Sequence, residues 1–239
     1  MAININQVYK SVLVVLQQQK RGVLTPVEFN KVATQAQQEI FIEYFDELNQ
    51  LLRQPQTSLA YADRYALLDE KIQIFKRVES LSTSATGTVT PTTAVQELGT
   101  VVYFATSTSE GREVQRIQAY EVYTTNQSPL TKPSTFYPVY TYENNVIQLY
   151  PTTIASGTND IQLNFLKYPS DVKWGFTIDT ELGNYIYNAQ SSVDFELHQS
   201  DQPMVIDKIL GYAGVMTRDQ LALQLASQKE QQIDIDGQK

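Results

Sequence analysis

Apolar residues near the start of the chain recur at the three-to-four-residue spacing of one helix face. Ile5, Val8, Val12, Val15 and Leu16 form such a stripe, so the sequence predicts an amphipathic N-terminal helix. A second stripe with the same spacing comprises Tyr61, Tyr65, Leu68, Ile72 and Phe75. It is followed by Lys76 and Arg77, where cations stabilise the C-terminal end of a helix. We therefore expect the first eighty residues to be helical.

Between these two stripes, Thr25-Pro26-Val27-Glu28 has the sequence of a helix start. Thr25 suits the N-cap, Pro26 suits the first helical position, and Glu28 completes a capping box. This helix is predicted to end near Arg53. Its apolar stripe is wide, so it either contacts another subunit or is buried within its own bundle. The candidate assembly residues on it are Phe29, Val32, Phe41, Phe45 and Leu52.

After a Ser/Thr-rich segment at 81–94, the pattern changes to short runs typical of β-strands. The predicted strands are Thr100–Ala105, Tyr137–Tyr142, Val146–Tyr150, Ile161–Tyr168, Trp174–Ile178 and Tyr185–Tyr187. Asn144 and Asn145 predict a tight hairpin turn between two of these strands. A short helix is expected within residues 114–125.

Helical spacing returns near residue 200. Ser200 or Asp201 can cap the helix, with Pro203 in its first turn. Its stripe supplies three further candidate assembly residues, namely Val205, Ile209 and Tyr212. A further helix is predicted to begin at the capping-box sequence Thr217-Arg218-Asp219-Gln220 and to run to about residue 231.

These patterns predict an α+β protein in which N- and C-terminal helices form one bundle interrupted by an inserted antiparallel β domain. The predicted division is 1–80 and 200–239 for the helical bundle, 95–199 for the β domain, and 81–94 for a linker or loop.

Composition narrows the classes of function. The chain carries a net charge of −8, with 18 Lys and Arg residues that are scattered along it. Gripping nucleic acid requires clustered cations, so specific DNA binding is not expected, whereas DNA could slide past an acidic surface. The absence of cysteine excludes thiol nucleophiles and disulfides. The N-terminus does not have the pattern of a signal peptide, and no apolar run is long enough to span a membrane.

The sequence contains no arrangement typical of a catalytic, metal or cofactor site. His198 is the single histidine and is expected to be structural, near a helix start. The carboxylate pairs Glu39 with Glu43, Asp46 with Glu47, and Asp179 with Glu181 have no motif around them. No Gly-rich phosphate loop is present. The 15 tyrosines, many of them in the β region, suit an interface, although binding of a carbohydrate or receptor would use the same residues.

Several segments together resemble a family of virion structural proteins from crAss-like and related Bacteroidetes tailed phages. They are 21–30 (RGVLTPVEFN) with Ala33 to Phe41, 126–133 (NQSPLTKP), 147–154 (IQLYPTTI), 173–175 (KWG), 195–198 (FELH) with Asp201 and Pro203, 208–210, and 213–214. The segment 81–94 has no match in this resemblance.

The resemblance implies a neck or tail ring protein, or portal adaptor, built from a helical bundle with an inserted β domain. Such a protein forms a homo-oligomeric ring, twelve-fold as in this class, after synthesis in the host cytoplasm. Its partners would be the portal protein and other neck or tail rings, with double-stranded DNA passing through unbound. The alternatives are a receptor- or glycan-binding tail component and a tail-associated peptidoglycan hydrolase.

Overall fold

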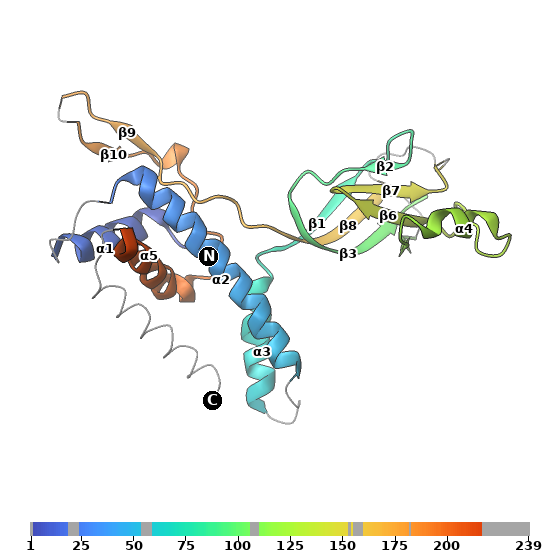
Figure 1. Ribbon diagram of the computed structural model, residues 1–239, viewed down its shortest axis with the longest axis horizontal. Coiled ribbons are helices and arrows are strands. Elements are labelled where there is room, and N and C mark those ends of the chain that lie inside the picture. Colours follow the sequence, from blue (N-terminus) through green and yellow to red (C-terminus); the bar gives the residue numbers. More distant parts are fainter. Residues whose placement is uncertain are drawn as a thin grey trace. The chain divides into compact units, whose positions relative to one another are not determined.

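The computed structural model describes residues 2–18, 24–53, 59–105, 110–152, 154, 160–181 and 183–216 (Figure 1). The chain divides into two compact units. Unit 1 comprises residues 1–74 and 169–239, and unit 2 comprises residues 75–168. Helices and mainly antiparallel strands are both abundant, which confirms the α+β class. The helix predicted from Thr217 lies outside the described residues.

Unit 1 contains the helices α1 (Ile5–Gln18), α2 (Pro26–Arg53), α3 (Leu59–Ile72) and α5 (Gln202–Met216). Helix α5 packs against α1 and α2, and α3 packs against α2. The predicted stripes supply the core, since Val8, Phe29 and Val205 are all fully buried. No helix in the described part of the chain is both long and apolar enough to cross a bilayer.

Both ends of α2 lie where the sequence predicts them. The capping box forms as expected: Thr25 N donates to Glu28 Oε2 (2.9 Å), and Glu28 N donates to Thr25 Oγ1 (3.4 Å). These bonds satisfy main-chain N–H groups that have no partner within the helix. The helix therefore begins at Pro26 and continues to Arg53.

A row of polar side chains on α2 binds the extended segment 170–174, and we call this arrangement the α2 clamp. Residues 30, 34 and 37 are three to four positions apart and therefore lie on one face of the helix. Each bonds to the main chain of alternate residues in the extended segment. The hydrogen-bonded pairs are Asn30 Oδ1 with Trp174 N (2.7 Å), Thr34 Oγ1 with Val172 N (3.2 Å), and Gln37 Nε2 with Ser170 O (2.7 Å).

The clamp positions a two-stranded hairpin made of β9 (Phe176–Ile178) and β10 (Tyr185–Tyr187). At its base, the Trp174 ring lies 4.3 Å from that of Tyr9 on α1 and 5.7 Å from that of Tyr187. Two short 3-10 helices, η1 (Ala189–Ser191) and η2 (Gln199–Asp201), then lead into α5.

Unit 2 contains two four-stranded sheets. Their strand orders are β1-β8-β3-β4 and β2-β7-β6-β5, and all neighbouring strands are antiparallel except the parallel pair β5 and β6. The elements are β1 (Lys76–Leu81), β2 (Thr88–Val89), β3 (Val95–Tyr103), β4 (Arg112–Glu113), β5 (Gln115–Arg116), α4 (Glu121–Gln127), β6 (Val139–Glu143), β7 (Val146–Tyr150) and β8 (Ile161–Lys167).

One apolar core is shared by the two sheets of unit 2. Alternate residues of β8, namely Ile161, Leu163 and Phe165, are buried in it, as the period of two requires for a strand with one face inward. Asn144 and Asn145 have φ values of 49° and 61°. Positive φ at both positions is the geometry of a type I′ turn, so the predicted hairpin between β6 and β7 is confirmed.

The segment 81–94, predicted as a linker or loop, is a loop apart from the end of β1 and the two residues of β2. Most of this segment is built into unit 2: Thr83 N donates to Asp160 Oδ1 (2.8 Å), and Thr88 pairs with Gln148 across β2 and β7. Serine and threonine hydroxyls bond readily to nearby main chain, as Ser84 Oγ does in accepting from Thr88 N (3.0 Å). A polar composition can therefore encode a tight, bonded turn.

Other predicted boundaries also need correction. Residues 75–80 were predicted as helical, but α3 ends at Ile72. Residues 76–81 instead pair with β8 as strand β1. Residues 169–199, assigned to the β domain, belong to unit 1, where the α2 clamp binds residues 170–174. The short helix expected within 114–125 begins at Glu121, because Val114 is buried in the core of unit 2 and β5 follows it.

Candidate assembly surfaces

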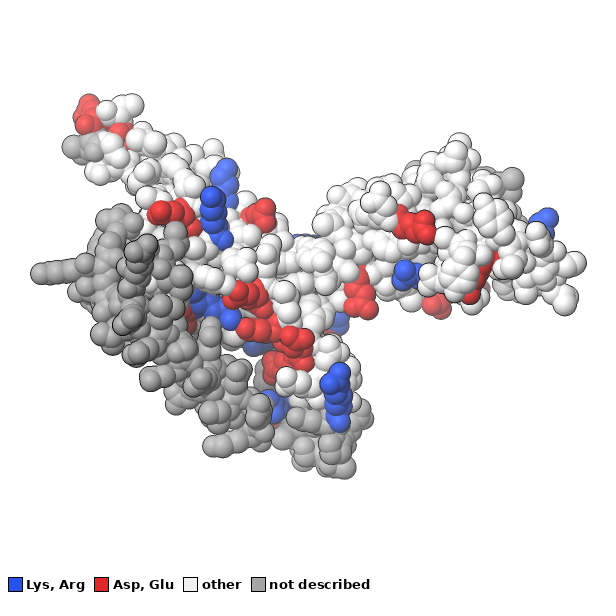
Figure 2. Space-filling view, in the orientation of Figure 1, with Lys and Arg blue, Asp and Glu red and all other residues white. Residues whose placement is uncertain are grey.

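Residues 120–137 of unit 2, which we call the aromatic loop, expose many large apolar side chains. The exposed fractions are 76% for Tyr120, 77% for Tyr123, 96% for Leu130, 62% for Phe136 and 82% for Tyr137. Single exposed apolar residues are normal, but several large ones within one short segment make that segment a candidate binding surface. Figure 2 shows mainly uncharged atoms over α4, the helix within this loop.

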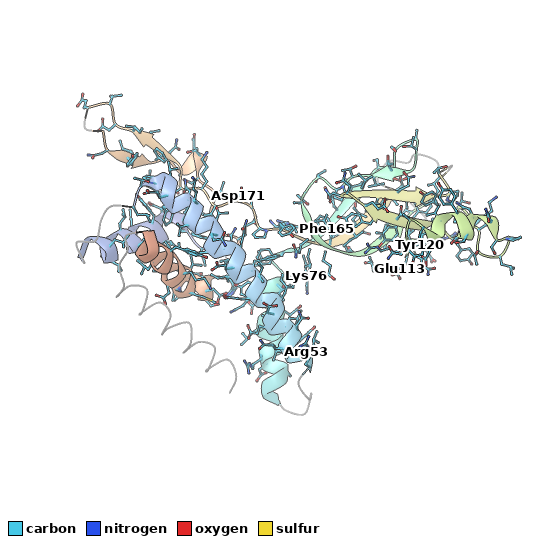
Figure 3. The ribbon with its side chains drawn as sticks, viewed as in Figure 1. Arg53, Lys76, Glu113, Tyr120, Phe165 and Asp171 are labelled. Atoms are coloured by element: carbon cyan, nitrogen blue, oxygen red, sulfur yellow. The ribbon has the colours of Figure 1, made fainter. Side chains whose placement is uncertain are left out.

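Hydrogen bonds fix the first half of the aromatic loop. Helix α4 begins where Gln118 N donates to Glu121 Oε2 (3.1 Å). Within it Val122 is the buried side chain, so the neighbouring Tyr123 and Tyr120 point away from the core. Figure 3 labels Tyr120 at the start of this helix. The tyrosines are therefore displayed by a structured element.

The second half of the loop is attached to β4 through Arg112. The guanidinium lies 4.8 Å from the Phe136 ring and donates to Phe136 O (3.1 Å). A turn follows, in which Tyr137 N donates to Ser134 O (3.1 Å). Stacking of a cation on an aromatic face is favourable even at an exposed site. Phe136 is thus positioned although more than half of its surface is exposed.

The surroundings of the aromatic loop carry a slight positive charge, unlike the chain as a whole. Residues 111–140 contain three cations and two anions, namely Arg112, Arg116 and Lys132 against Glu113 and Glu121. The whole chain has a net charge of −8. This segment is therefore less acidic than the chain as a whole, and the cation of Arg112 contacts the loop directly at Phe136.

A second exposed apolar surface lies on unit 1, on the hairpin of β9 and β10. We call residues 176–187 the hairpin arm, and in Figure 1 it forms a two-stranded ribbon. Ile178 is 59% exposed, Ile186 53% and Tyr185 47%. A two-stranded hairpin is at best marginally stable in water unless it packs against something else. Its base packs on Trp174, while Ile178 and Ile186 are more than half exposed in the described structure.

The tip of the hairpin arm is acidic. It carries Asp179 and Glu181, and no Lys or Arg occurs in residues 174–193. Asp179 N donates to Asn184 O and Gly183 N donates to Asp179 O, both at 2.9 Å. Gly183 has a φ of 67°, which a residue with a side chain adopts less readily. Figure 2 shows acidic atoms at this tip.

Most of the residues proposed from the sequence as an assembly surface are not exposed. Five of the eight, Phe29, Val32, Phe41, Val205 and Ile209, are buried in the core of unit 1. They are buried because α5 packs against α2, which accounts for the wide apolar stripe. Phe45 and Tyr212 are half-buried, and Leu52 is exposed.

The aromatic loop was only partly visible in the sequence, through its tyrosines. Leu130 and Phe136 follow neither a period of two nor a period of 3.6, and prolines at 129, 133 and 138 interrupt the segment. Apolar residues without a period in a proline-rich segment cannot all face one core. That combination was the available signal for an exposed apolar surface.

His198 has the structural position that the sequence predicts. Its Nδ1 accepts a hydrogen bond from Ser200 N (3.3 Å) and so caps η2. Ser200 Oγ lies 2.8 Å from the same nitrogen, and Glu70 lies 3.8 Å from Nε2. The order Ser–His–Glu resembles a catalytic triad, but here the serine is within the turn that the histidine caps.

One of the carboxylate pairs considered for acid–base chemistry, Glu39 with Glu43, has a structural partner. Lys208 of α5, only 9% exposed, lies 2.7 Å from Glu43 and 3.6 Å from Glu39. Asp201 accepts from Tyr44 Oη (2.5 Å) and from Lys71 Nζ (2.8 Å). Among the described residues, no three His, Cys, Asp or Glu side chains are placed to hold a metal ion.

Comparison with known proteins found no relative of this chain. No protein-family model matches the chain, and no curated protein matches it.

Proposed function

We propose that this protein is a non-catalytic structural subunit of a tailed-phage virion, which forms a ring around the DNA channel in the neck or tail. The observation that carries the proposal is the presence of two separate exposed apolar surfaces, the aromatic loop on unit 2 and the hairpin arm on unit 1. In a cyclic ring each interface is heterologous, so every subunit needs two different adhesive surfaces.

The assignment to a phage virion rests on the segments that resemble the crAss-like phage family. Two of these segments adjoin the exposed surfaces: 126–133 lies within the aromatic loop, and 173–175 leads into the hairpin arm. The resemblance also implies a helical bundle interrupted by an inserted β domain. The division of the chain into residues 1–74 with 169–239 and residues 75–168 supports that arrangement.

Charge and partners follow from the same proposal. An acidic ring repels DNA, so the packaged duplex passes through without specific binding. The neighbours of the ring would be the portal protein and other neck or tail rings. The subunit requires no cofactor, and its single histidine and buried carboxylates serve to join helices.

Electron microscopy of the purified full-length protein tests the proposal. Class averages and particle masses are measured over a range of concentrations, and virions are labelled with gold-conjugated antibodies to the chain. Rings with a central channel, together with label at the neck or tail, are expected. Monomers or fibres at every concentration, with no label on virions, would overturn the proposal.

A glycan-binding tail component is the second candidate, favoured by the exposed tyrosines at 120, 123 and 137. An open cleft of about 510 Å³ in unit 2, lined in part by Glu113, Gln115 and Arg116, adds polar groups that could bind sugar hydroxyls. A glycan array separates the two functions. Specific glycan binding that Tyr123→Ala abolishes, without a change in oligomeric state, would favour this candidate over the ring. A zymogram tests for peptidoglycan hydrolysis.

A further inference from the structure

We propose that the hairpin arm of one copy docks on the aromatic loop of the next copy, and that this contact is the interface that builds the assembly. The inference rests on the proposed self-assembly and names the two surfaces that carry it. In the described parts of the chain, large apolar side chains of both surfaces are exposed, and the two surfaces differ in charge.

The exposed area of the aromatic loop approaches that of one side of a standard interface. An aromatic side chain presents about 150–250 Å², so the four exposed rings of the aromatic loop offer roughly 600 Å². Leu130, almost fully exposed, extends this surface. A standard protein interface buries about 800 Å² on each partner. Ile178, Tyr185 and Ile186 of the arm supply apolar groups to face these rings.

Charge complementarity selects the arm as the occupant of the loop. The arm carries Asp179 and Glu181 without a cation, whereas the surroundings of the loop carry one cation more than their anions. Opposite charges at the rim of an interface favour the correct partner and speed association. The rest of the chain is acidic as well, but the arm combines its carboxylates with exposed apolar side chains, Ile178 and Ile186, that can cover the rings of the loop.

Contacts between like surfaces fit the observations less well. Two arms brought together would place four carboxylates at one contact, and a contact between two loops would leave both arms uncovered. Either would also be isologous and would close as a dimer. Only the contact of arm with loop leaves one free arm and one free loop on the growing assembly, as a ring requires.

Complementation between two variants tests this pairing. Ile186→Lys disables the arm, and Tyr123→Glu disables the loop by placing a carboxylate against the acidic arm. Each variant alone retains only one competent surface and is expected to stay monomeric, with association about 30-fold weaker or more. Mixed together, the intact loop of the first variant and the intact arm of the second should form a one-to-one dimer that grows no further.

The control is Leu67→Lys, which changes an equally exposed apolar side chain on α3 and should leave assembly unchanged. Circular dichroism and the fluorescence of Trp174, the single tryptophan, verify folding. Because the chain has no cysteine, Ile178→Cys and Tyr137→Cys can be mixed, and a disulfide between chains is expected only in the mixture.

The outcomes separate the inference from the proposed function. Failure of the unaltered chain to assemble, alone or on virions, contradicts the ring itself. Assembly of the unaltered chain that persists in both variants contradicts the arm-and-loop contact but leaves the ring. A dimer formed by either variant alone indicates contacts between like surfaces and overturns the inference, as do monomeric variants that do not form a dimer when mixed.

Discussion

Unit 1 and unit 2 hold their strands in different ways. In unit 2, β-strands enclose an apolar core that includes Ile147, Leu149 and Leu163. In unit 1, the extended segment after residue 169 is attached to α2 by side-chain amides and a hydroxyl that bond to its main chain. Apolar side chains can fill a core in several arrangements, whereas a hydrogen bond forms only between one donor and one acceptor at matching positions. The clamp therefore fixes the register of a segment that returns after a long insertion.

The largest expected effect is a truncation in the core of unit 2. Leu163→Ala removes a fully buried side chain of β8 and should lower the free energy of unfolding of unit 2 by about 3 kcal/mol. Hydrogen exchange should accelerate in residues 75–168, while the Trp174 fluorescence transition of unit 1 stays in place. Val78→Ala, at an exposed position of β1, is the control. Equal acceleration in both units would show that they unfold as one.

The next largest effect should come from the clamp. Gln37 is fully buried, donates to Ser170 O (2.7 Å) and accepts from Glu196 N (2.8 Å). Gln37→Ala leaves both main-chain groups without this partner, at a cost of about 2 kcal/mol. The loss should appear in the Trp174 fluorescence transition under urea.

Gln35→Ala is the matched control for the clamp variant. Gln35 lies on the same helix but bonds only to the exposed Glu39 side chain in the contacts described (3.3 Å). It should change the stability by no more than about 0.5 kcal/mol. Similar losses in the two variants would mean that the clamp contributes no more than a surface contact.

Much of the fold could be predicted because its signals are local. The capping box specified the start of α2, and Asn144 with Asn145 specified a hairpin turn. Strand β1 was missed because residues 76–81 become a strand only by pairing with β8, some eighty positions later. The clamp was missed for the same reason, since polar residues on a helix usually indicate a solvated face. The candidate site failed at residues such as Phe29, whose buried ring packs on Tyr9 of α1, a tertiary contact that the helix pattern does not specify.

A smaller effect is expected at the junction of α2 and η2. Burial, followed by its hydrogen bond to Asp201, raises the pKa of Tyr44 far above its usual range, so the hydroxyl remains a donor. Tyr44→Phe should cost about 1 kcal/mol, because Asp201 keeps its bond to Lys71. Thermal denaturation measures the loss. Tyr9→Phe is the control, since its hydroxyl lies a long 3.5 Å from Leu24 O. A larger loss in the control would contradict the prediction.

The smallest effect is a pH dependence at the capping box. The hydrogen bonds from Thr25 hold the pKa of Glu28 below its usual value of 4.5. A carboxyl whose pKa is lower in the folded state contributes stability above the unfolded value, and this is lost as the pH falls through the folded value. The native chain should therefore lose stability in urea below about pH 4.5, and Glu28→Gln should lose less over that window. Thr25→Ser keeps the hydroxyl and should retain the native pH dependence. If Glu28→Gln instead follows the native chain at every pH, the charge of Glu28 contributes nothing to stability. The start of α2 then depends on Thr25, Pro26 and the buried contacts of the helix. In that case unit 1 would resemble unit 2 in its dependence on apolar packing more than its polar contacts suggest.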